Sequence, residues 1–174
     1  MVTRTYLDVD GVINSLNPLR GDCWPVPAEE LRIHKAKGFT LHVPEYMPKL
    51  IQALDTCTEI VWCTTWEDDA NTWISPIVEI PERRVLHPRP GAGAFHWKET
   101  SVLADMAENP CDAAIWIEDF GYALDRRFAK SGVRPVDTTL APHGFETNGR
   151  FVNVLLQSHL DGYRLELPSM EVTR

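Results

Sequence analysis

The feature that most constrains the fold is the alternation of short apolar segments with segments of helical periodicity. Apolar runs suited to buried strands occur at residues 5–9, 60–63, 84–86, 113–117 and 133–140. The helical patterns between and after them have apolar positions at Met47, Leu50, Ile51 and Leu54; at Val102, Leu103 and Met106; at Leu124 and Phe128, ending at Gly132; and at Phe151, Val154, Leu155 and Ser158. Strands separated by single helices favour a parallel sheet with helices on both faces, because right-handed crossovers leave few other arrangements. The expected fold class is therefore α/β, with ligands bound at the carboxyl ends of the strands.

Two helix starts are expected from local chemistry. Pro44 and Glu45 suit the first turn of the helix that carries Met47. A second helix is expected to begin near Trp66, where the acidic residues at 67–69 complement the positive end of the helix dipole.

Residues 14–43 interrupt the alternation where a doubly wound domain would pass directly into a helix. Within this segment, residues 31–34 and 39–43 are typical of short strands joined around Lys37-Gly38, which predicts a hairpin. We expect one domain over residues 1–174, in which 15–43 form a flap or minimal cap over the sheet edge that carries Asp8. A plain surface loop is the alternative.

Length and composition fit one globular domain. A chain of 174 residues can bury about 70% of its unfolded surface without disulfides or metal ions. Its 44% hydrophobic and 24% charged residues lie outside the range of disordered chains. The formal net charge of -8 argues against a broad electrostatic contact with nucleic acid, since cations that neutralise phosphates dominate such binding. The net charge does not exclude a basic cleft at one place on the surface.

The sequence also bears on compartment. The first residues, MVTRTYLDVDG, contain no apolar signal-peptide core, and no segment approaches the ~20 apolar residues of a membrane span. Cys23, Cys57, Cys63 and Cys111 have neither a CxxC pair nor the spacing of a disulfide framework, so reduced thiols are expected. We therefore expect a cytoplasmic protein with no membrane partner, as a monomer or a dimer.

The stretch TYLDVDGVIN places two carboxylates one residue apart at the end of an apolar run. Alternate side chains of a strand share a face, so Asp8 and Asp10 are expected on the same side, about 6–7 Å apart at their Cα atoms. A cation, or a reaction that needs one acid and one base, would offset their repulsion. A calcium-binding EF-hand loop is excluded, because its turn glycine and bidentate glutamate would fall on Ile13 and Leu19.

Further polar groups stand near the ends of the other predicted strands. Thr64 and Thr65 follow the second strand, and Glu118-Asp119 end the fourth; Lys98 lies near the start of the helix between them. A hydroxyl and free amides at a strand-to-helix junction suit a phosphate, although a threonine there is also an ordinary N-cap. Considered by itself, a single lysine on a helix, such as Lys98, is typically a charge exposed to solvent.

As an ordered set these residues resemble the haloacid dehalogenase-like (HAD) phosphohydrolases. The four family motifs are matched by LDVDGVIN, VWCTTW, HWK and IWIEDF, over about residues 3–120. The resemblance implies a Rossmann-like three-layer sandwich of minimal-cap type, similar to HAD-like domains of actinobacterial and phage proteins, some of them associated with RNA repair. In many relatives the fourth motif is Asp-Asp, so Glu118 is a departure.

The resemblance also implies a mechanism and a cofactor. Asp8 would be the nucleophile that forms an aspartyl phosphate, and Asp10 would be the general acid and base. Thr64 and Lys98 would complete the catalytic set. Phosphate binding would involve Asp8, Gly11, Thr64, Thr65 and Lys98. Mg²⁺ would be bound by Asp8, Asp10 and Asp119, with Glu118 as a direct or indirect partner.

The resemblance predicts a magnesium-dependent phosphatase but does not specify its substrate. A nucleotide, a polynucleotide end and a small phosphorylated metabolite are all compatible with it. The alternatives are a phosphotransferase, which would use the same residues, and a HAD-like module that binds phosphate or metal without turnover. Arg89 is a candidate for the rim of the site, and a base-stacking platform is a further candidate, formed from Trp24, Trp66, Trp73 and Trp97.

Overall fold

The computed structural model describes residues 2–15, 31–93, 97–118 and 133–137, the last of these as backbone only. Within these ranges a five-stranded parallel sheet has the order β5-β4-β1-β6-β7. The bounds of the strands are β1 Thr3–Leu7, β4 Glu59–Trp62, β5 Arg84–Val85, β6 Ala113–Glu118 and β7 Val133–Asp137. The predicted α/β class with a central parallel sheet is thereby confirmed.

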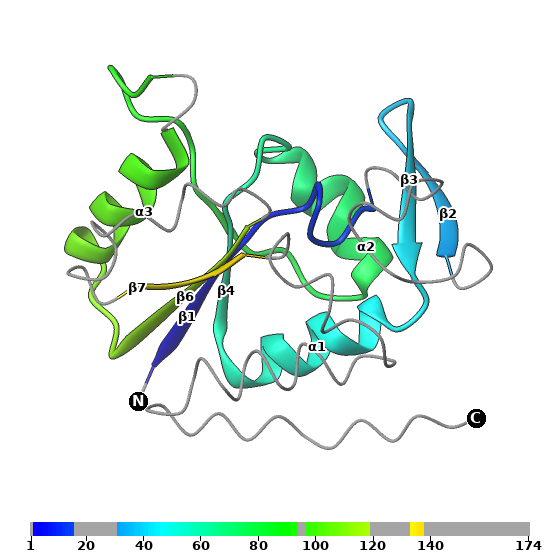
Figure 1. Ribbon diagram of the computed structural model, residues 1–174, viewed down its shortest axis with the longest axis horizontal. Coiled ribbons are helices and arrows are strands. Elements are labelled where there is room, and N and C mark those ends of the chain that lie inside the picture. The colour runs from blue at the N-terminus through cyan, green and yellow to red at the C-terminus, as the bar shows by residue number, and fades with distance from the viewer. Residues whose placement is uncertain (1, 16–30, 94–96, 119–132, 138–174) are drawn as a thin grey trace.

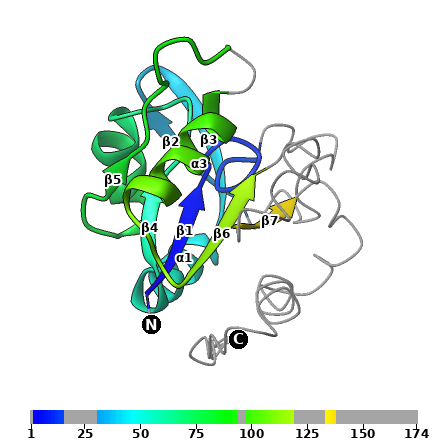
Figure 2. The ribbon, with the colours of Figure 1, turned by 90° about the vertical axis from the view of Figure 1, so that its left-hand side faces the viewer.

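Helices cover both faces of the sheet (Figure 1). Their bounds are α1 Met47–Cys57, the π-helical turn η2 Ala70–Ile74, α2 Ser75–Val78 and α3 Trp97–Glu108. Turning the molecule by 90° shows α3 in front of the strands, with β7 at the far edge (Figure 2). None of the helices in the described ranges has the length and apolar character of a membrane span.

The two faces of the sheet follow from the alternation of side chains along each strand. Leu7, Ile115 and Ile117 belong to one core cluster, together with the buried face of α1 and with α2. Their neighbours Tyr6 and Trp116 belong to a second cluster on the α3 side. This separation is the period of two that a strand imposes, and it explains why successive residues of β1 and β6 are apolar where both faces are covered.

The predicted element boundaries shift for local reasons. β1 ends at Leu7, before the predicted Val9, because the Val9 carbonyl accepts hydrogen bonds from the amides of residues 12–14 and closes a turn. Helix α1 starts at Met47, with a proline in its first turn, and Pro44 belongs to a strand instead. The helix expected near Trp66 starts later, at Ala70, because Glu67 adopts a φ of +48°, which an α-helix cannot contain.

The predicted hairpin is present. Strands β2 (Leu31–Ala36) and β3 (Phe39–Pro44) pair antiparallel, with Ala36 opposite Phe39. The two turn residues, Lys37 and Gly38, have φ values of +49° and +83°. Positive φ at both positions is the requirement of the tight turns that match strand twist, which is why glycine occupies the second of them.

Several predicted features lie outside the described residues. They are Cys23, Trp24, Asp119, the helices expected around Leu124 and Phe128 and around Phe151 to Ser158, and positions 138–140 of the last strand. Among the described cysteines, Cys57, Cys63 and Cys111 form no disulfide.

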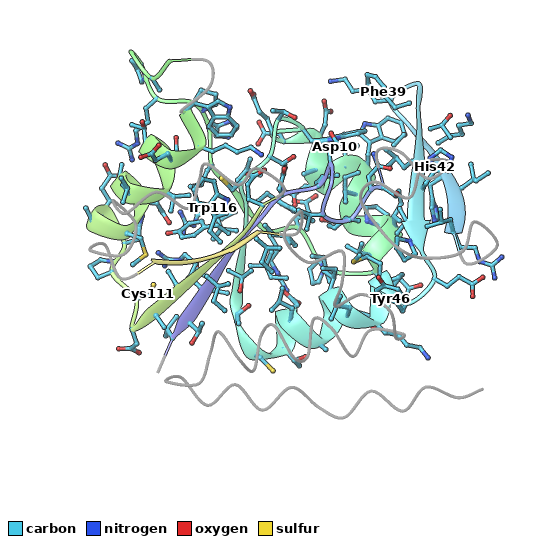
Figure 3. The ribbon with its side chains drawn as sticks, in the orientation of Figure 1. Asp10, Phe39, His42, Tyr46, Cys111 and Trp116 are labelled. Atoms are coloured by element: carbon cyan, nitrogen blue, oxygen red, sulfur yellow. The ribbon has the colours of Figure 1, made fainter. Side chains whose placement is uncertain are left out.

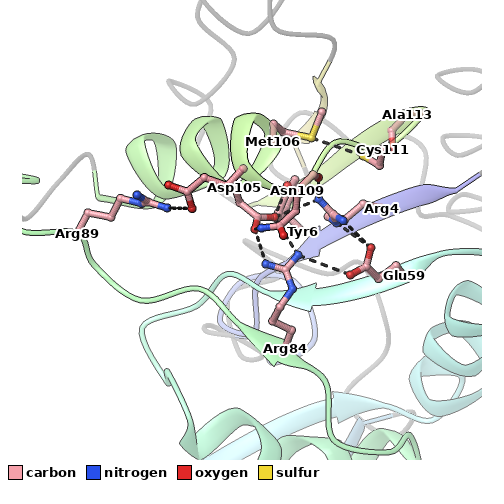
Figure 4. Close-up of polar contacts among 11 residues, drawn as sticks. Arg4, Tyr6, Glu59, Arg84, Arg89, Asp105, Met106, Asn109, Cys111 and Ala113 are labelled. Carbon is pink, nitrogen blue, oxygen red and sulfur yellow. Dashed lines mark hydrogen bonds and ion pairs between the residues drawn. The ribbon is translucent and has the colours of Figure 1, made fainter.

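A buried ionic network centred on Asp105 joins α3 to the sheet (Figure 4). Its carboxylate accepts hydrogen bonds from Tyr6 Oη at 2.7 Å, Asn109 Nδ2 at 2.8 Å, Arg84 Nη2 at 2.9 Å and Arg4 Nη1 at 3.3 Å. Burial would raise the pKa of Asp105, but the hydrogen bonds from Arg84 and Tyr6 outweigh it, so the pKa is lowered.

We predict that Asp105→Asn lowers the free energy of unfolding by about 1–3 kcal/mol at pH 7, because Arg4 and Arg84 lose a charged partner and keep only Glu59 among the described residues. A depressed carboxyl pKa contributes stability above the unfolded-state pKa and loses it as the pH falls through the folded-state value. The deficit of the variant should therefore shrink below about pH 4. Urea unfolding at pH 7 and pH 3 measures both effects.

Glu108→Gln, on the same helix, is the matched control. Glu108 pairs with Arg89, and both side chains are exposed. Its substitution should leave the unfolding midpoint unchanged at both pH values. An equal deficit of Asp105→Asn at both pH values would contradict the role of its charge.

Candidate functional site

Two carboxylates and one ammonium group meet at the carboxyl edge of the sheet. Asp8 follows β1, Glu118 is the last residue of β6, and Lys98 lies in the first turn of α3. The ammonium group of Lys98 lies 2.8 Å from Asp8 Oδ2 and 2.8 Å from Glu118 Oε2. The three side chains are 15%, 5% and 4% exposed, so the ion pairs are shielded from water.

The register of the parallel strands produces this meeting. Leu7 pairs with Ile117, and the amide of Asp8 donates a hydrogen bond to the Ile117 carbonyl at 3.1 Å. Asp8 and Glu118, the residues that follow this pair, are therefore next to each other in the register of the two strands. Because parallel strands all end at one edge, Asp8 and Glu118 are neighbours although 110 residues separate them. A shift of one residue would turn either carboxylate to the opposite face.

The charge of Lys98 is fixed by its two partners. Burial would lower its pKa, but the adjacent carboxylates of Asp8 and Glu118 outweigh that effect and raise it. A raised lysine pKa keeps the ammonium group protonated at every pH below the unfolded-state value and releases the proton only in strong alkali. One ammonium group and two carboxylates give this cluster a formal charge of one negative.

Asp10 follows Asp8 by two residues and is held by two donors. Asn14 Nδ2 donates to its Oδ1 at 2.8 Å, and Trp66 Nε1 donates to its Oδ2 at 2.9 Å. Asn14 Oδ1 in turn accepts a hydrogen bond from the backbone amide of His42 in β3 at 2.9 Å. The carboxylate of Asp10 is thus connected to the β2–β3 hairpin through one side chain.

The residues after β4 separate into a buried and an exposed position. Thr64 is fully buried, and its hydroxyl accepts the Trp66 amide at 3.3 Å, as an N-cap does. Thr65 is exposed. Gly11 has a φ of +75°, a value that favours glycine directly after Asp10.

The remaining candidates are placed as follows. Arg89 is paired with Glu108 on α3, which is the contact of a surface arginine. Trp97 is buried and Trp73 is 39% exposed, whereas Trp66 lines a cavity beside Asp10. The structure therefore brings together Asp8, Lys98 and Glu118, sets Asp10 and Trp66 beside each other, and gives no common platform of tryptophans in its described part.

The candidate metal ligands are incompletely described. In the described ranges no group of three His, Cys, Asp or Glu side chains is arranged to hold a metal ion. Asp119 lies outside these ranges, and the Glu118 carboxylate already accepts from Lys98. The donors that suit a hard cation are oxygens of Asp8 and Asp10, next to the net negative charge of the cluster.

Sequence reasoning missed the residues that orient Asp10. Asn14 stands four residues after Asp10, and this spacing within a glycine-containing turn was the available signal. The contact of Trp66 with Asp10 spans 56 positions and has no signal in the sequence.

We predict that Lys98→Met lowers the free energy of unfolding by about 3–5 kcal/mol at pH 7, because two buried carboxylates lose their shared counter-ion. Their mutual repulsion would raise a carboxyl pKa in the folded variant, so stability should recover as the pH falls from 7 to 5. Urea unfolding at both pH values measures this recovery.

Lys49→Met, on helix α1, is its control, since Lys49 makes no ion pair among the described residues. A variant Lys98→Met as stable as wild type at pH 7 would show that the cluster is not ionised as described.

Comparisons of this chain with known proteins identify no relative at a significant level. The chain matches no protein-family model, no curated protein and no solved structure at a significant level. The site itself joins a buried lysine to two strand-end carboxylates, and a third carboxylate, Asp10, follows Asp8 by two residues and is held by Trp66.

Proposed function

We propose that this protein is a HAD-like phosphatase that hydrolyses a phosphomonoester through an aspartyl-phosphate intermediate and depends on Mg²⁺. The observation that carries the proposal is the position of Lys98, 2.8 Å from both Asp8 and Glu118. A lone helix lysine would be a solvated charge; this one is buried against the carboxylate that the motif order marks as nucleophile. The strand order, with β1 at the centre, supports the same proposal.

Asp8 acts as the nucleophile. One of its oxygens attacks phosphorus, the bond from phosphorus to the leaving oxygen breaks, and an aspartyl phosphate forms. Water then attacks phosphorus, which releases inorganic phosphate and restores the carboxylate. Lys98 holds Asp8 in place and neutralises charge that gathers on the phosphoryl oxygens.

Asp10 acts as the general acid and base. It donates a proton to the leaving oxygen in the first step and takes one from the attacking water in the second, so the protons balance over the cycle. Trp66 and Asn14 each donate a hydrogen bond to one of its oxygens and so fix the orientation of the carboxyl group. A positioning role for both follows from these contacts.

The phosphoryl group binds where the strand ends and the turns meet. Thr64, Thr65 and the backbone at Gly11 follow β4 and β1, at the same edge as Lys98. Backbone amides at such junctions suit phosphate oxygens.

Magnesium fits the chemistry of the donors. Oxygen ligands from Asp8 and from the backbone carbonyl of Asp10 suit this ion, and Asp119 would supply a further carboxylate. Lys98 engages one oxygen of Asp8 and one of Glu118, and within the acidic pair the match to the family motif favours Asp119 as the direct ligand. When bound, the cation would neutralise the repulsion between the carboxylates and the anionic phosphate.

We predict that wild-type protein releases phosphate from phosphomonoesters with Mg²⁺, and that EDTA or Asp8→Asn abolishes the release. Asp8→Asn should retain a cooperative unfolding transition, since the substitution keeps the shape of the side chain. Phosphate release from p-nitrophenyl phosphate and a panel of natural phosphomonoesters is the measurement. An added alcohol that becomes phosphorylated would indicate a phosphotransferase instead.

Asp68→Asn is the control for Asp8→Asn, since the Asp68 side chain is 80% exposed on a neighbouring turn. It should keep full activity. Metal-independent turnover, or turnover that survives Asp8→Asn, would refute the proposed mechanism.

We also predict that Trp66→Phe lowers kcat by about tenfold or more, because it keeps a ring but removes the donor to Asp10. Trp73→Phe, on the adjacent helical turn, is the matched control and should leave kcat unchanged. Equal rates in both variants would exclude a positioning role for the Trp66 indole.

A further inference from the structure

A cavity of about 480 Å³ lies beside Asp10, on the side of the hairpin. Its walls come from the turn after β1, from the β2–β3 hairpin and from the residues after β4, and they include Ser15, Phe39, His42 and Trp66. Figure 3 shows Asp10, Phe39 and His42 at the same end of the molecule. The volume lies in the range of sites for small molecules, about 300–1,000 Å³.

The aromatic wall of this cavity is built from two distant parts of the chain. Phe39 follows the tight turn of the hairpin and meets Trp66 edge to face, with ring centroids 5.8 Å apart and planes at 68°. Phe39 is nevertheless 60% exposed, a large apolar surface left in water at the mouth of a cavity. The Trp66 ring is fixed by its hydrogen bond to Asp10. Rigid aromatic surfaces of this kind suit a planar ring that stacks on them.

The charges of the described lining select against an anionic occupant. Lys37 is paired with Asp69, and Asp10 adds a further carboxylate. An occupant with additional phosphates would face this negative charge without an unpaired lysine or arginine among the lining residues of the described ranges. A neutral ring system is therefore favoured over a chain of phosphates.

A buried hydroxyl adds a polar requirement. Ser15 lines the cavity, is 2% exposed, and its Oγ has no hydrogen-bond partner among the described residues. An unsatisfied buried hydroxyl is unfavourable, so a rotation of this side chain toward the cavity would let a polar group of a bound ligand supply the missing partner.

We propose that this cavity binds the nucleoside part of a nucleoside monophosphate, with its base against Phe39 and Trp66. The inference rests on the proposed phosphatase function: Asp10, which would protonate the leaving oxygen, is also part of the cavity lining. The leaving group is then an uncharged nucleoside of a size that fills one cavity, and a nucleoside triphosphate or a polynucleotide end is a poor substrate.

Binding is tested first, without reference to turnover. Calorimetric titration of wild-type protein with adenosine and with uridine should show saturable binding, whereas ribose should show none. Phe39→Ala should weaken nucleoside binding by about tenfold, as loss of a base-stacking ring does. Phe39→Tyr should restore it, and thermal melting checks that each variant is folded.

Ile33→Ala is the matched control, because Ile33 is 67% exposed on the same hairpin and does not line the cavity. It should bind nucleosides as wild type does. Absence of nucleoside binding, or equal binding by wild type and Phe39→Ala, would overturn the proposal.

Kinetics then connects the cavity to the reaction. The ratio of kcat/KM for adenosine 5′-monophosphate to that for glycerol 3-phosphate should exceed one and fall by about tenfold in Phe39→Ala. A preference for phosphorylated oligonucleotides or for nucleoside triphosphates would overturn the assignment to mononucleotides.

The two proposals fail in different ways. Nucleoside binding without turnover of any phosphomonoester would refute the phosphatase function and leave the cavity assignment standing. If kcat/KM were the same for all leaving groups and no nucleoside bound, the cavity assignment would be refuted and the phosphatase function would stand.

Discussion

The hydrogen-bonded register of β1 with its two neighbours is the constraint on which the rest of the structure depends. Leu7 pairs with Trp62 of β4 on one side and with Ile117 of β6 on the other. All three strands run parallel, and their apolar side chains are buried on both faces, so a shift of register would misplace these side chains. That register alone decides that Asp8, Thr64 and Glu118 emerge at one edge.

Helix α3 is fixed to this sheet by ion pairs near both of its ends. In its first turn Lys98 bridges Asp8 and Glu118, and in its third turn Asp105 accepts from Arg84 and from Tyr6. The carboxylates of Asp8, Glu118 and Asp105 are all buried and all paired, which is the condition under which a buried charge is tolerated. One set of contacts belongs to the candidate site, and the other joins the same helix to β1 and β5.

The hairpin is coupled to the candidate site by polar contacts rather than by the sheet. Asn14 joins the Asp10 carboxylate to the backbone of His42, and Phe39 packs against the indole that donates to Asp10. A displacement of β3 would therefore disturb the orientation of Asp10. If the hairpin moved as a flap, these contacts would transmit its movement to Asp10. The role of the hairpin as a flap stays a prediction.

The sequence by itself determined the fold class and the approximate positions of most strands and helices in the described part. Apolar runs of strand length and helical spacing at Met47, Leu50 and Leu54 reflect burial, which acts residue by residue and leaves a periodic trace. The hairpin turn at Lys37-Gly38 was readable for a similar reason, since positive φ demands particular residues. Lys98 was identified from motif order alone, because no periodicity distinguishes it from a solvated lysine.

Only the tertiary structure decided which side chains meet. The pairing of Lys98 with Asp8 and Glu118, the contact of Trp66 with Asp10 and the network around Asp105 each join residues that are far apart in the chain. Such contacts depend on strand register and helix placement, which are properties of the packed whole. A local pattern records that a residue is buried or exposed, and only packing specifies the neighbour that it meets.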